Sequence, residues 1–163
     1  MEVIIRHTEP GDFVGIQALY AQAGAYSGTL QLPHPSQHLW QQRLAAPGPD
    51  SYSLVAEANG IIVGQIGMDL MSSPRRRHVG NIGMAVCSNQ QNRGIGAQLL
   101  AAMLDLANNW LAVTRIELEV YTDNEAAIAL YEKYGFVKEG TAKNYAFRDG
   151  RYVDAYLMAR VSL

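Results

Sequence analysis

Residues 80–106, GNIGMAVCSNQQNRGIGAQLLAAMLDL, decide the fold of the chain. Their first part alternates bulky with small residues, a period of two that predicts a strand: Ile82, Met84 and Val86 against Gly83, Ala85 and Cys87. Their last part places apolar residues three or four positions apart, which predicts an amphipathic helix. A polar loop with two glycines joins the two parts. The segment therefore predicts a strand, a glycine loop and a helix, in that order.

The loop at residues 91–96 has the features of an anion site. The first N–H groups of a helix lack partners within the helix and lie at the positive end of its dipole, so a phosphate is stabilised there. Gly94 and Gly96 leave the backbone open to an anion, and Arg93 offers a forked cation. The glycines alone favour a plain strand-to-helix turn over an anion site. A dinucleotide-binding loop is excluded because it needs a glycine at Leu99, and a P-loop because Gly-Lys-Ser/Thr is absent.

Two motifs together suggest a family. The pattern Gln91-x-x-Gly94-x-Gly96 after an apolar strand resembles the acetyl-CoA signature of the GCN5-related N-acetyltransferases (GNAT). Residues 124–136, NEAAIALYEKYGF, resemble the other signature of that superfamily, an Asn followed by Leu-Tyr and Gly-Phe. The resemblance covers residues 3–160 and looks closest to the bacterial L-amino-acid N-acetyltransferases.

The resemblance implies a single GNAT domain over residues 1–163 with an α/β fold. The expected architecture is a central, mixed, twisted sheet of about six or seven strands, flanked by about four helices, in which the fourth and fifth strands splay apart. The implied cofactor is acetyl-CoA. Its expected contacts are the fourth strand, the glycine loop and one face of the last helix: Met84, Ala85 and Val86; Gln91, Asn92, Arg93, Gly94, Ile95, Gly96 and Ala97; and Asn124, Ala127 and Tyr131.

The implied reaction is direct attack of an amine on the thioester in a ternary complex. Tyr131 is the expected acid, because a phenol with a pKa near ~10 can donate a proton to a thiolate whose conjugate thiol has a pKa near ~8.5. Glu119 is the expected base, since it points off the core face of the fifth strand, where ribosomal-protein acetyltransferases of the superfamily carry a catalytic Glu. An exposed structural carboxylate is the competing interpretation of Glu119, and His78 or a water chain stays open as the alternative base.

The acceptor is expected to be a free L-amino acid with an apolar side chain. Protein N-termini, polyamines and amine antibiotics are the alternative acceptors, and a non-catalytic acyl-CoA-binding sensor is the alternative function. The expected substrate contacts combine apolar and aromatic residues with one histidine: Tyr26, Leu30, Leu32, Trp40, His78 and Tyr145. Simple packing of the aromatic residues on the sheet is an equally valid interpretation.

The composition disfavours several classes of binding partner. The net charge of −2 disfavours nucleic acid and anionic membranes, and the single Cys87 excludes an internal disulfide. Without a signal peptide or a long apolar span, a cytoplasmic protein is expected. Cys87 is expected to be a small buried apolar group. A homodimer is left open, and no metal is expected, because Pro33 and Pro35 argue against a helix that would place His34 and His38 together.

Turn residues predict the remaining connections. Asn59-Gly60 predicts a tight hairpin between two apolar strands, and Asp149-Gly150 predicts another between strands at residues 145–147 and 152–158. Gly135 is expected to end the last helix in a left-handed conformation. Ser36 is expected to cap a helix that contains Trp40.

Overall fold

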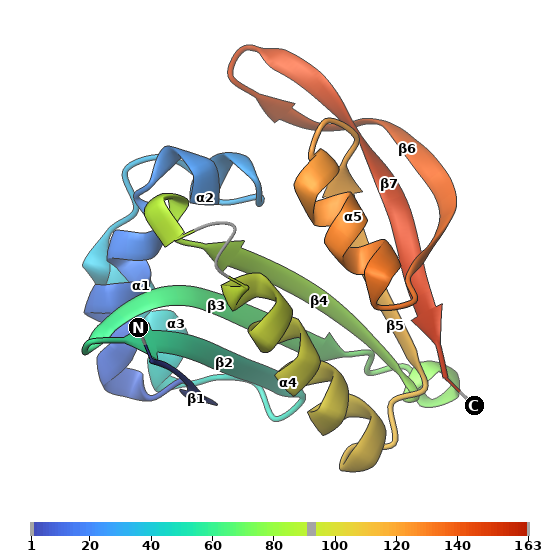
Figure 1. Ribbon diagram of the computed structural model, residues 1–163, viewed down its shortest axis with the longest axis horizontal. Helices are drawn as coiled ribbons and strands as arrows, with labels where there is room; N and C mark the ends of the chain where they lie inside the picture. The colour runs from blue at the N-terminus through green and yellow to red at the C-terminus, as the bar shows by residue number, and fades with distance from the viewer. Residues whose placement is uncertain (1, 91–93, 163) are drawn as a thin grey trace.

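The computed structural model describes residues 2–90 and 94–162. Seven strands form one sheet with the order β1-β2-β3-β4-β5-β7-β6 (Figure 1). Its strands are β1 (Val3–His7), β2 (Ser51–Ala58), β3 (Ile61–Leu70), β4 (Val79–Val86), β5 (Arg115–Tyr121), β6 (Val137–Arg148) and β7 (Arg151–Val161). The α-helices are α1 (Phe13–Tyr20), α2 (Ala23–Ser27), α3 (Gln37–Ala45), α4 (Ile95–Asn109) and α5 (Glu125–Lys133), and short 3-10 turns are η1 (Pro10–Asp12), η2 (Pro74–Arg76) and η3 (Ser88–Gln90).

The mixed sheet with splayed central strands is confirmed. Strands β4 and β5 are parallel and pair only from Val79 with Arg115 to Asn81 with Glu117. Beyond these pairs β4 stays with β3 on its other edge, while β5 stays with β7. The two halves of the sheet therefore separate toward the carboxyl ends of β4 and β5, as Figure 1 shows.

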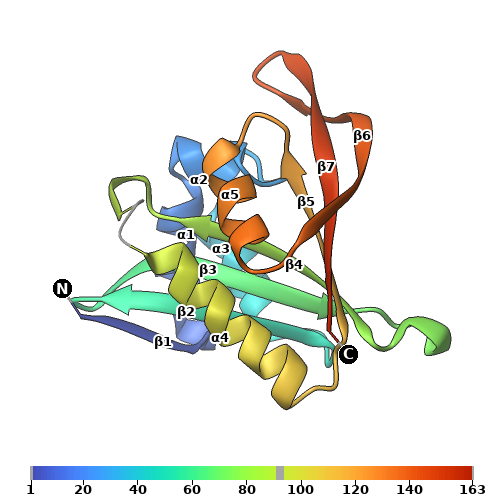
Figure 2. The ribbon, with the colours of Figure 1, turned by 45° about the vertical axis from the view of Figure 1, so that its right-hand side comes forward.

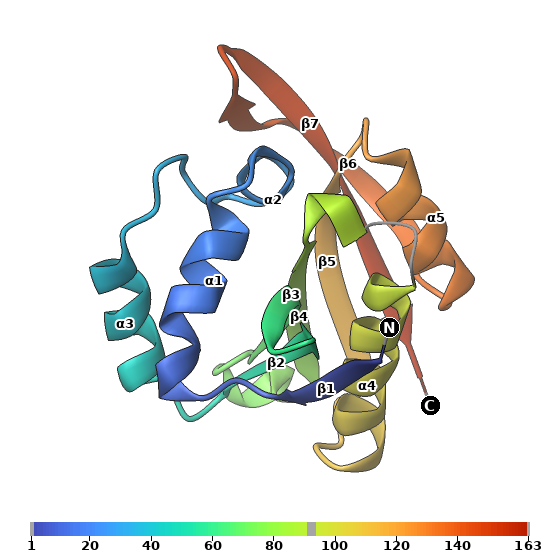
Figure 3. The same cartoon turned by 60° about the vertical axis from the view of Figure 1, so that its left-hand side comes forward.

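Helices cover both faces of the sheet. Figure 3 shows α1 and α3 on one side, with α4 and α5 on the other. The alternation in β4 explains this arrangement, since Ile82 is buried in the core beneath α4, whereas Ala85 is buried with Ile16 and Trp40 beneath α1 and α3. The bulky and small faces predicted for this strand thus pack against different helices.

Cys87 differs from its prediction as a buried apolar group. Its side chain is half-buried, its Sγ accepts a hydrogen bond from Gln22 Nε2 at 3.1 Å, and it donates one to Asn89 Oδ1 at 3.0 Å. The strand ends at Val86, so Cys87 already lies in the polar loop that follows.

Turn chemistry follows the sequence closely. Asn59 and Gly60 have φ angles of 52° and 76° between β2 and β3, and Asp149 and Gly150 have φ angles of 51° and 78° between β6 and β7. The Ser36 hydroxyl accepts the Leu39 N–H at 3.0 Å, which confirms the predicted cap of α3.

The length of the last hairpin and the helix α2 were not predicted. Strand β6 begins at Val137, well before residue 145, and its register with β7 shifts twice, between Lys138 and Gly140 and between Ala142 and Ala146. Such shifts break the alternation by which a strand is identified from sequence. In Figure 2 the hairpin rises beyond α5 from the rest of the sheet. No helix among residues 2–90 and 94–162 is long and apolar enough to span a membrane.

Helix α5 ends in the predicted left-handed glycine. Gly135 has a φ of 92°, its N–H donates to Glu132 O, and the Phe136 N–H donates to Tyr131 O, each at 3.0 Å. This pair of hydrogen bonds is a Schellman motif, which directs the chain from α5 into β6. The Gly-Phe of the second signature therefore ends the helix that carries Tyr131.

We expect Gly135→Ala to lower the free energy of unfolding by about 1–2 kcal/mol, because a Cβ is strained at this φ. Urea denaturation followed by circular dichroism measures the change. Gly140→Ala is the matched control, since a Cβ there meets nothing within 4 Å. Equal stability of the two variants would show that the left-handed cap is not under strain.

Candidate active site

A cavity of about 690 Å³ opens where β4 and β5 separate. It is lined from both halves of the sheet and from the helices on both faces. The lining residues are Tyr20, Gly24, Ala25, Gly28, Thr29, Leu30, Gln31 and Trp40; Gln65, Gly67, Asp69, Asn81, Ile82, Gly83, Met84, Ala85 and Val86; Gly94, Ile95, Gly96 and Ala97; and Glu119, Val120, Tyr121, Asn124, Ala126, Ala127, Leu130, Tyr131, Tyr145 and Ala155.

The floor of the cavity is set by strand register. Gly67 of β3 pairs with Gly83 of β4, so two neighbouring strands present no side chain there. Two residues further along the same strands, and on the same face of the sheet, Asp69 pairs with Asn81. The Asn81 amide donates to both carboxylate oxygens of Glu119, at 3.2 and 3.1 Å. Asp69, Asn81 and the predicted base Glu119 therefore form a row across β3, β4 and β5.

Aromatic side chains form one wall. Tyr20 and Trp40 stack with ring centroids 5.0 Å apart, and the Tyr20 hydroxyl donates to Gln65 Oε1 at 2.6 Å. Burial raises the pKa of Tyr20, so this hydroxyl stays protonated. The Arg43 guanidinium lies 4.8 Å from the Trp40 ring centroid. Arg43 itself does not line the cavity.

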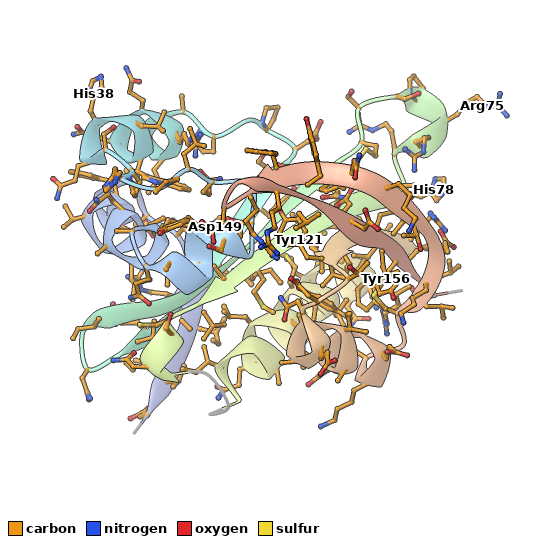
Figure 4. The ribbon with its side chains drawn as sticks, turned by 90° about the horizontal axis from the view of Figure 1, so that it is seen from above. His38, Arg75, His78, Tyr121, Asp149 and Tyr156 are labelled. Carbon is orange, nitrogen blue, oxygen red and sulfur yellow. The ribbon has the colours of Figure 1, made fainter. Side chains whose placement is uncertain are left out.

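Tyr121 bridges the cavity at its open end. Its hydroxyl donates to the carbonyl of Thr29 at 2.8 Å, and its ring lies 6.4 Å from that of Tyr145 in an edge-on arrangement. The Arg148 guanidinium lies 5.1 Å from the Tyr121 ring centroid and is ion-paired with Asp123. Figure 4 shows Tyr121 beside the turn of the β6–β7 hairpin, which Asp149 marks. Three parts of the chain thus meet at the Tyr121 side chain: strand β5, the β6–β7 hairpin and the segment that follows α2.

Tyr131 lies in the cavity wall on α5 and is almost fully buried, with 7% of its surface exposed. Burial raises its pKa to about 12. Its ring packs edge-on against Phe136 at 5.6 Å. Tyr131 therefore presents a protonated phenol over the whole physiological pH range.

Asn124 has a different position from the one expected on the face of the helix. It is the N-cap of α5, and its Oδ1 accepts the Ala127 N–H at 3.2 Å. Asn, like Ser and Asp, satisfies an unpaired N–H at the start of a helix. Asn124, Ala127 and Tyr131 all line the cavity nonetheless.

The residues expected to hold acetyl-CoA fit an extended thioester with a phosphate-bearing end. The edge of β4 beyond Asn81 has no partner in β5, a Cβ at Gly83 would meet nothing within 4 Å, and Gly94 caps the 15-residue α4 with a left-handed φ of 76°. Met84, Ala85 and Val86 line the cavity together with Gly94, Ile95, Gly96 and Ala97. Gln91, Asn92 and Arg93 lie outside the described residues.

The expected acceptor contacts divide into two groups. Leu30, Trp40 and Tyr145 line the cavity, whereas Tyr26, Leu32 and His78 do not. Helix α2 buries Ala25 instead of Tyr26, and Leu32 is 78% exposed in the segment that leaves the cavity toward α3.

His78 lies at the paired end of β4, away from the cavity. Its carbonyl accepts the N–H groups of Thr114 and Arg115 at 3.0 and 3.2 Å, and its side chain is exposed. Figure 4 shows His78 beside Arg75, apart from Tyr121, with His38 on the outer side of α3.

Several lining residues were not anticipated from the sequence, namely Tyr20, Gln65, Gly67, Asp69, Asn81 and Tyr121. One signal was present, because Gln65 and Asp69 interrupt an otherwise apolar strand. A polar residue within a buried run is the informative exception to apolar burial.

Sequence comparison identifies the family. The model of the acetyltransferase (GNAT) family matches residues 17–136. The chain belongs to this family. It is 49% identical over 160 residues to the L-amino acid N-acetyltransferase AaaT of Escherichia coli, with 98% of each chain covered. It is also 37% identical over 114 residues to the N-alpha-acetyltransferase RimI of Mycobacterium tuberculosis, which covers 70% of this chain and 68% of RimI.

Solved structures of the GNAT family share the fold. The ribosomal-protein-alanine N-acetyltransferase of Brucella melitensis superposes with a TM-score of 0.85 at 28% identity, covering 98% of this chain and 99% of that one. The chain is thus a GNAT-type N-acetyltransferase.

We expect the Tyr131 hydroxyl to remain protonated at the pH where a free phenol, with a pKa near ~10, ionises, because burial raises its pKa to about 12. Ultraviolet difference titrations of the wild type and Tyr131→Phe isolate this one side chain. A tyrosinate signal with a midpoint near ~10 that disappears in Tyr131→Phe would contradict the buried environment.

Proposed function

We propose that the chain transfers the acetyl group of acetyl-CoA to the α-amine of an L-amino acid with an apolar side chain. The observation that carries this proposal is the cavity itself, which places a protonated phenol, a carboxylate and an aromatic wall around one space at the strand splay. The similarity to AaaT, which spans nearly the whole of both chains, supports an amino acid as the acceptor.

Acetyl-CoA, when bound, supplies the acetyl group as a thioester. The unpaired edge of β4 at Met84, Ala85 and Val86 would hold its extended arm, and the start of α4 at Gly94 and Gly96 would hold its phosphates. The same role is proposed for Gln91, Asn92 and Arg93. Asn124 would contribute by capping α5, the helix that carries the lining residues Ala127 and Tyr131.

Tyr131 is the proposed acid. Its Oη carries a proton that a pKa of about 12 retains at neutral pH, so the phenol would offer this proton to the sulfur as the C–S bond breaks. Because a free thiol has the lower pKa, near ~8.5, the transfer is uphill taken alone and would be driven by the breakdown of the tetrahedral intermediate. The ring of Tyr131 packs edge-on against Phe136, and burial raises the pKa of its hydroxyl.

Glu119 is the proposed base. It lines the cavity on β5, and the Asn81 amide fixes its carboxylate with two hydrogen bonds. An amine whose pKa is near ~10.4, as for a lysine, arrives protonated at neutral pH and must lose a proton before attack. Glu119 would accept this proton directly or through a water molecule. His78 is less suited to this role because it lies outside the cavity lining.

The acceptor side chain would pack on the aromatic wall formed by Tyr20, Trp40, Tyr121 and Tyr145, with Leu30 at the rim. Full burial of one apolar side chain contributes about 1.5–3 kcal/mol, which is enough to separate Phe from Gly as acceptors. The runner-up is acetylation of protein N-termini, which the similarity to RimI favours.

We expect L-phenylalanine, L-methionine and L-leucine to exceed glycine and spermidine in kcat/KM by about tenfold or more, because only they bury an apolar side chain. CoA release from acetyl-CoA over this panel measures the selectivity. Glycine or spermidine as the best acceptor would contradict the proposal. Stabilisation of the fold by acetyl-CoA with no CoA release for any amine would instead indicate a non-catalytic acyl-CoA sensor.

We expect the acid and the base to separate in their pH dependence. Tyr131→Phe keeps the ring but removes the donor, so kcat should fall by about 10²–10⁴ at every pH. Glu119→Gln should lower kcat/KM most at low pH, and rising pH should rescue it, because solvent then supplies the neutral amine.

Paired pH–rate profiles on one acceptor test this assignment, with circular dichroism as the folding control. Equal rescue of both variants would reject the division of roles. A pH–rate profile of Glu119→Gln that matches the wild type would show that Glu119 is not the base and would favour a water chain in that role.

A further inference from the structure

The charged side chains that line the cavity all have the same sign. Among the described lining residues, Asp69 and Glu119 carry a charge, and none is Lys, Arg or His. The arginines that pack on the wall have other partners. Arg43 donates to Gln31 Oε1 at 3.0 Å behind Trp40, and Arg148 is ion-paired with Asp123 behind Tyr121.

The two carboxylates flank the open floor. Asp69 pairs in register with Asn81, and the Asn81 amide binds Glu119, so all three lie in a row across β3, β4 and β5. The adjacent pair Gly67 and Gly83 has no side chain to shield this row. The negative field reaches the opposite wall, because the pKa of Tyr145 is raised by burial and also by the charge of Glu119.

This charge distribution matters because of the covalent structure of an α-amino acid. Its amine and carboxylate are attached to the same carbon, so an amine that reaches Glu119 brings its carboxylate into the negative field of Glu119 and Asp69. Like charges within one cavity repel at the dielectric of a protein surface, and no lining cation among the described residues offsets this repulsion. An amide or peptide bond in place of the carboxylate removes the repulsion and keeps the amine.

We infer that the cavity prefers apolar acceptors in which the α-amine is free and the carboxyl group is uncharged, as in an amino-acid amide or the first residue of a peptide, and that Asp69 sets this preference. The inference rests on the proposed function and refines its acceptor. Asp69 suits the role because it lies on β3, apart from Tyr131 on α5, and its Oδ1 accepts the Ser51 hydroxyl at 2.6 Å.

The test compares L-phenylalaninamide with L-phenylalanine as acceptors for acetyl-CoA, using limiting kcat/KM values at high pH, where both amines are neutral. The amide should be better by about tenfold or more in the wild type. In Asp69→Asn, which can still accept from Ser51, the ratio should fall about threefold or more through a gain with L-phenylalanine.

Asp105→Asn is the matched control, since Asp105 is an exposed carboxylate on α4 outside the cavity lining, and its ratio should equal that of the wild type. Raising the salt concentration should lower the wild-type ratio, because ions screen the repulsion. This second measurement keeps the inference testable even if Asp69→Asn fails to fold.

A wild-type enzyme that uses L-phenylalanine as well as its amide would overturn the inference while leaving the proposed function intact. A ratio unaffected by both Asp69→Asn and salt would also overturn it. Failure to acetylate either compound would overturn the proposed function, and the inference with it.

Discussion

The pairing between β4 and β5 is the constraint on which the rest of the structure depends. It ends after Asn81 and Glu117, because each strand then follows its other neighbour. Ion pairs strengthen the closed end: Glu117 accepts from Arg115 at 2.8 Å and from Arg76 at 2.9 Å. Burial opposes the ionisation of Glu117, but these hydrogen bonds outweigh it and lower the pKa of the carboxyl. At the open end, the Tyr121 hydroxyl holds the Thr29 carbonyl, so both ends of the gap are fixed.

The alternation of side chains along β5 places neighbouring residues on opposite faces of the sheet. On β5, Leu118 and Val120 face the core under α4 and α5, while Glu119 and Tyr121 face the other side of the sheet. Tyr131 on α5 therefore approaches the gap from one face and Glu119 from the other. The acid and the base proposed above therefore come from opposite faces of the sheet, and the period of two along β5 supplies this separation.

Sequence was a good guide where the signal is local. The turns at Asn59-Gly60 and Asp149-Gly150, the cap at Ser36 and the left-handed Gly135 each depend on a few adjacent residues, and all of them were predictable. The contribution of β3 to the cavity was not, because Gly67 and Asp69 acquire their place only through register with β4. His78 was expected among the cavity residues but does not line the cavity, for a related reason. Its closeness to β4 in the sequence does not reveal at which end of the strand the gap opens.

The strand order has a consequence for how the molecule assembles. Strand β7 lies between β5 and β6, although it is the last of the seven strands in the chain. Strand β5 therefore has its long partner only when the β6–β7 hairpin has brought β7 back to its edge. A chain interrupted before Arg151 would leave β5 with one edge unpaired and the other paired over only three residues. Such an edge readily recruits strands from other molecules, so the pairing of β7 with β5 removes an edge that favours aggregation.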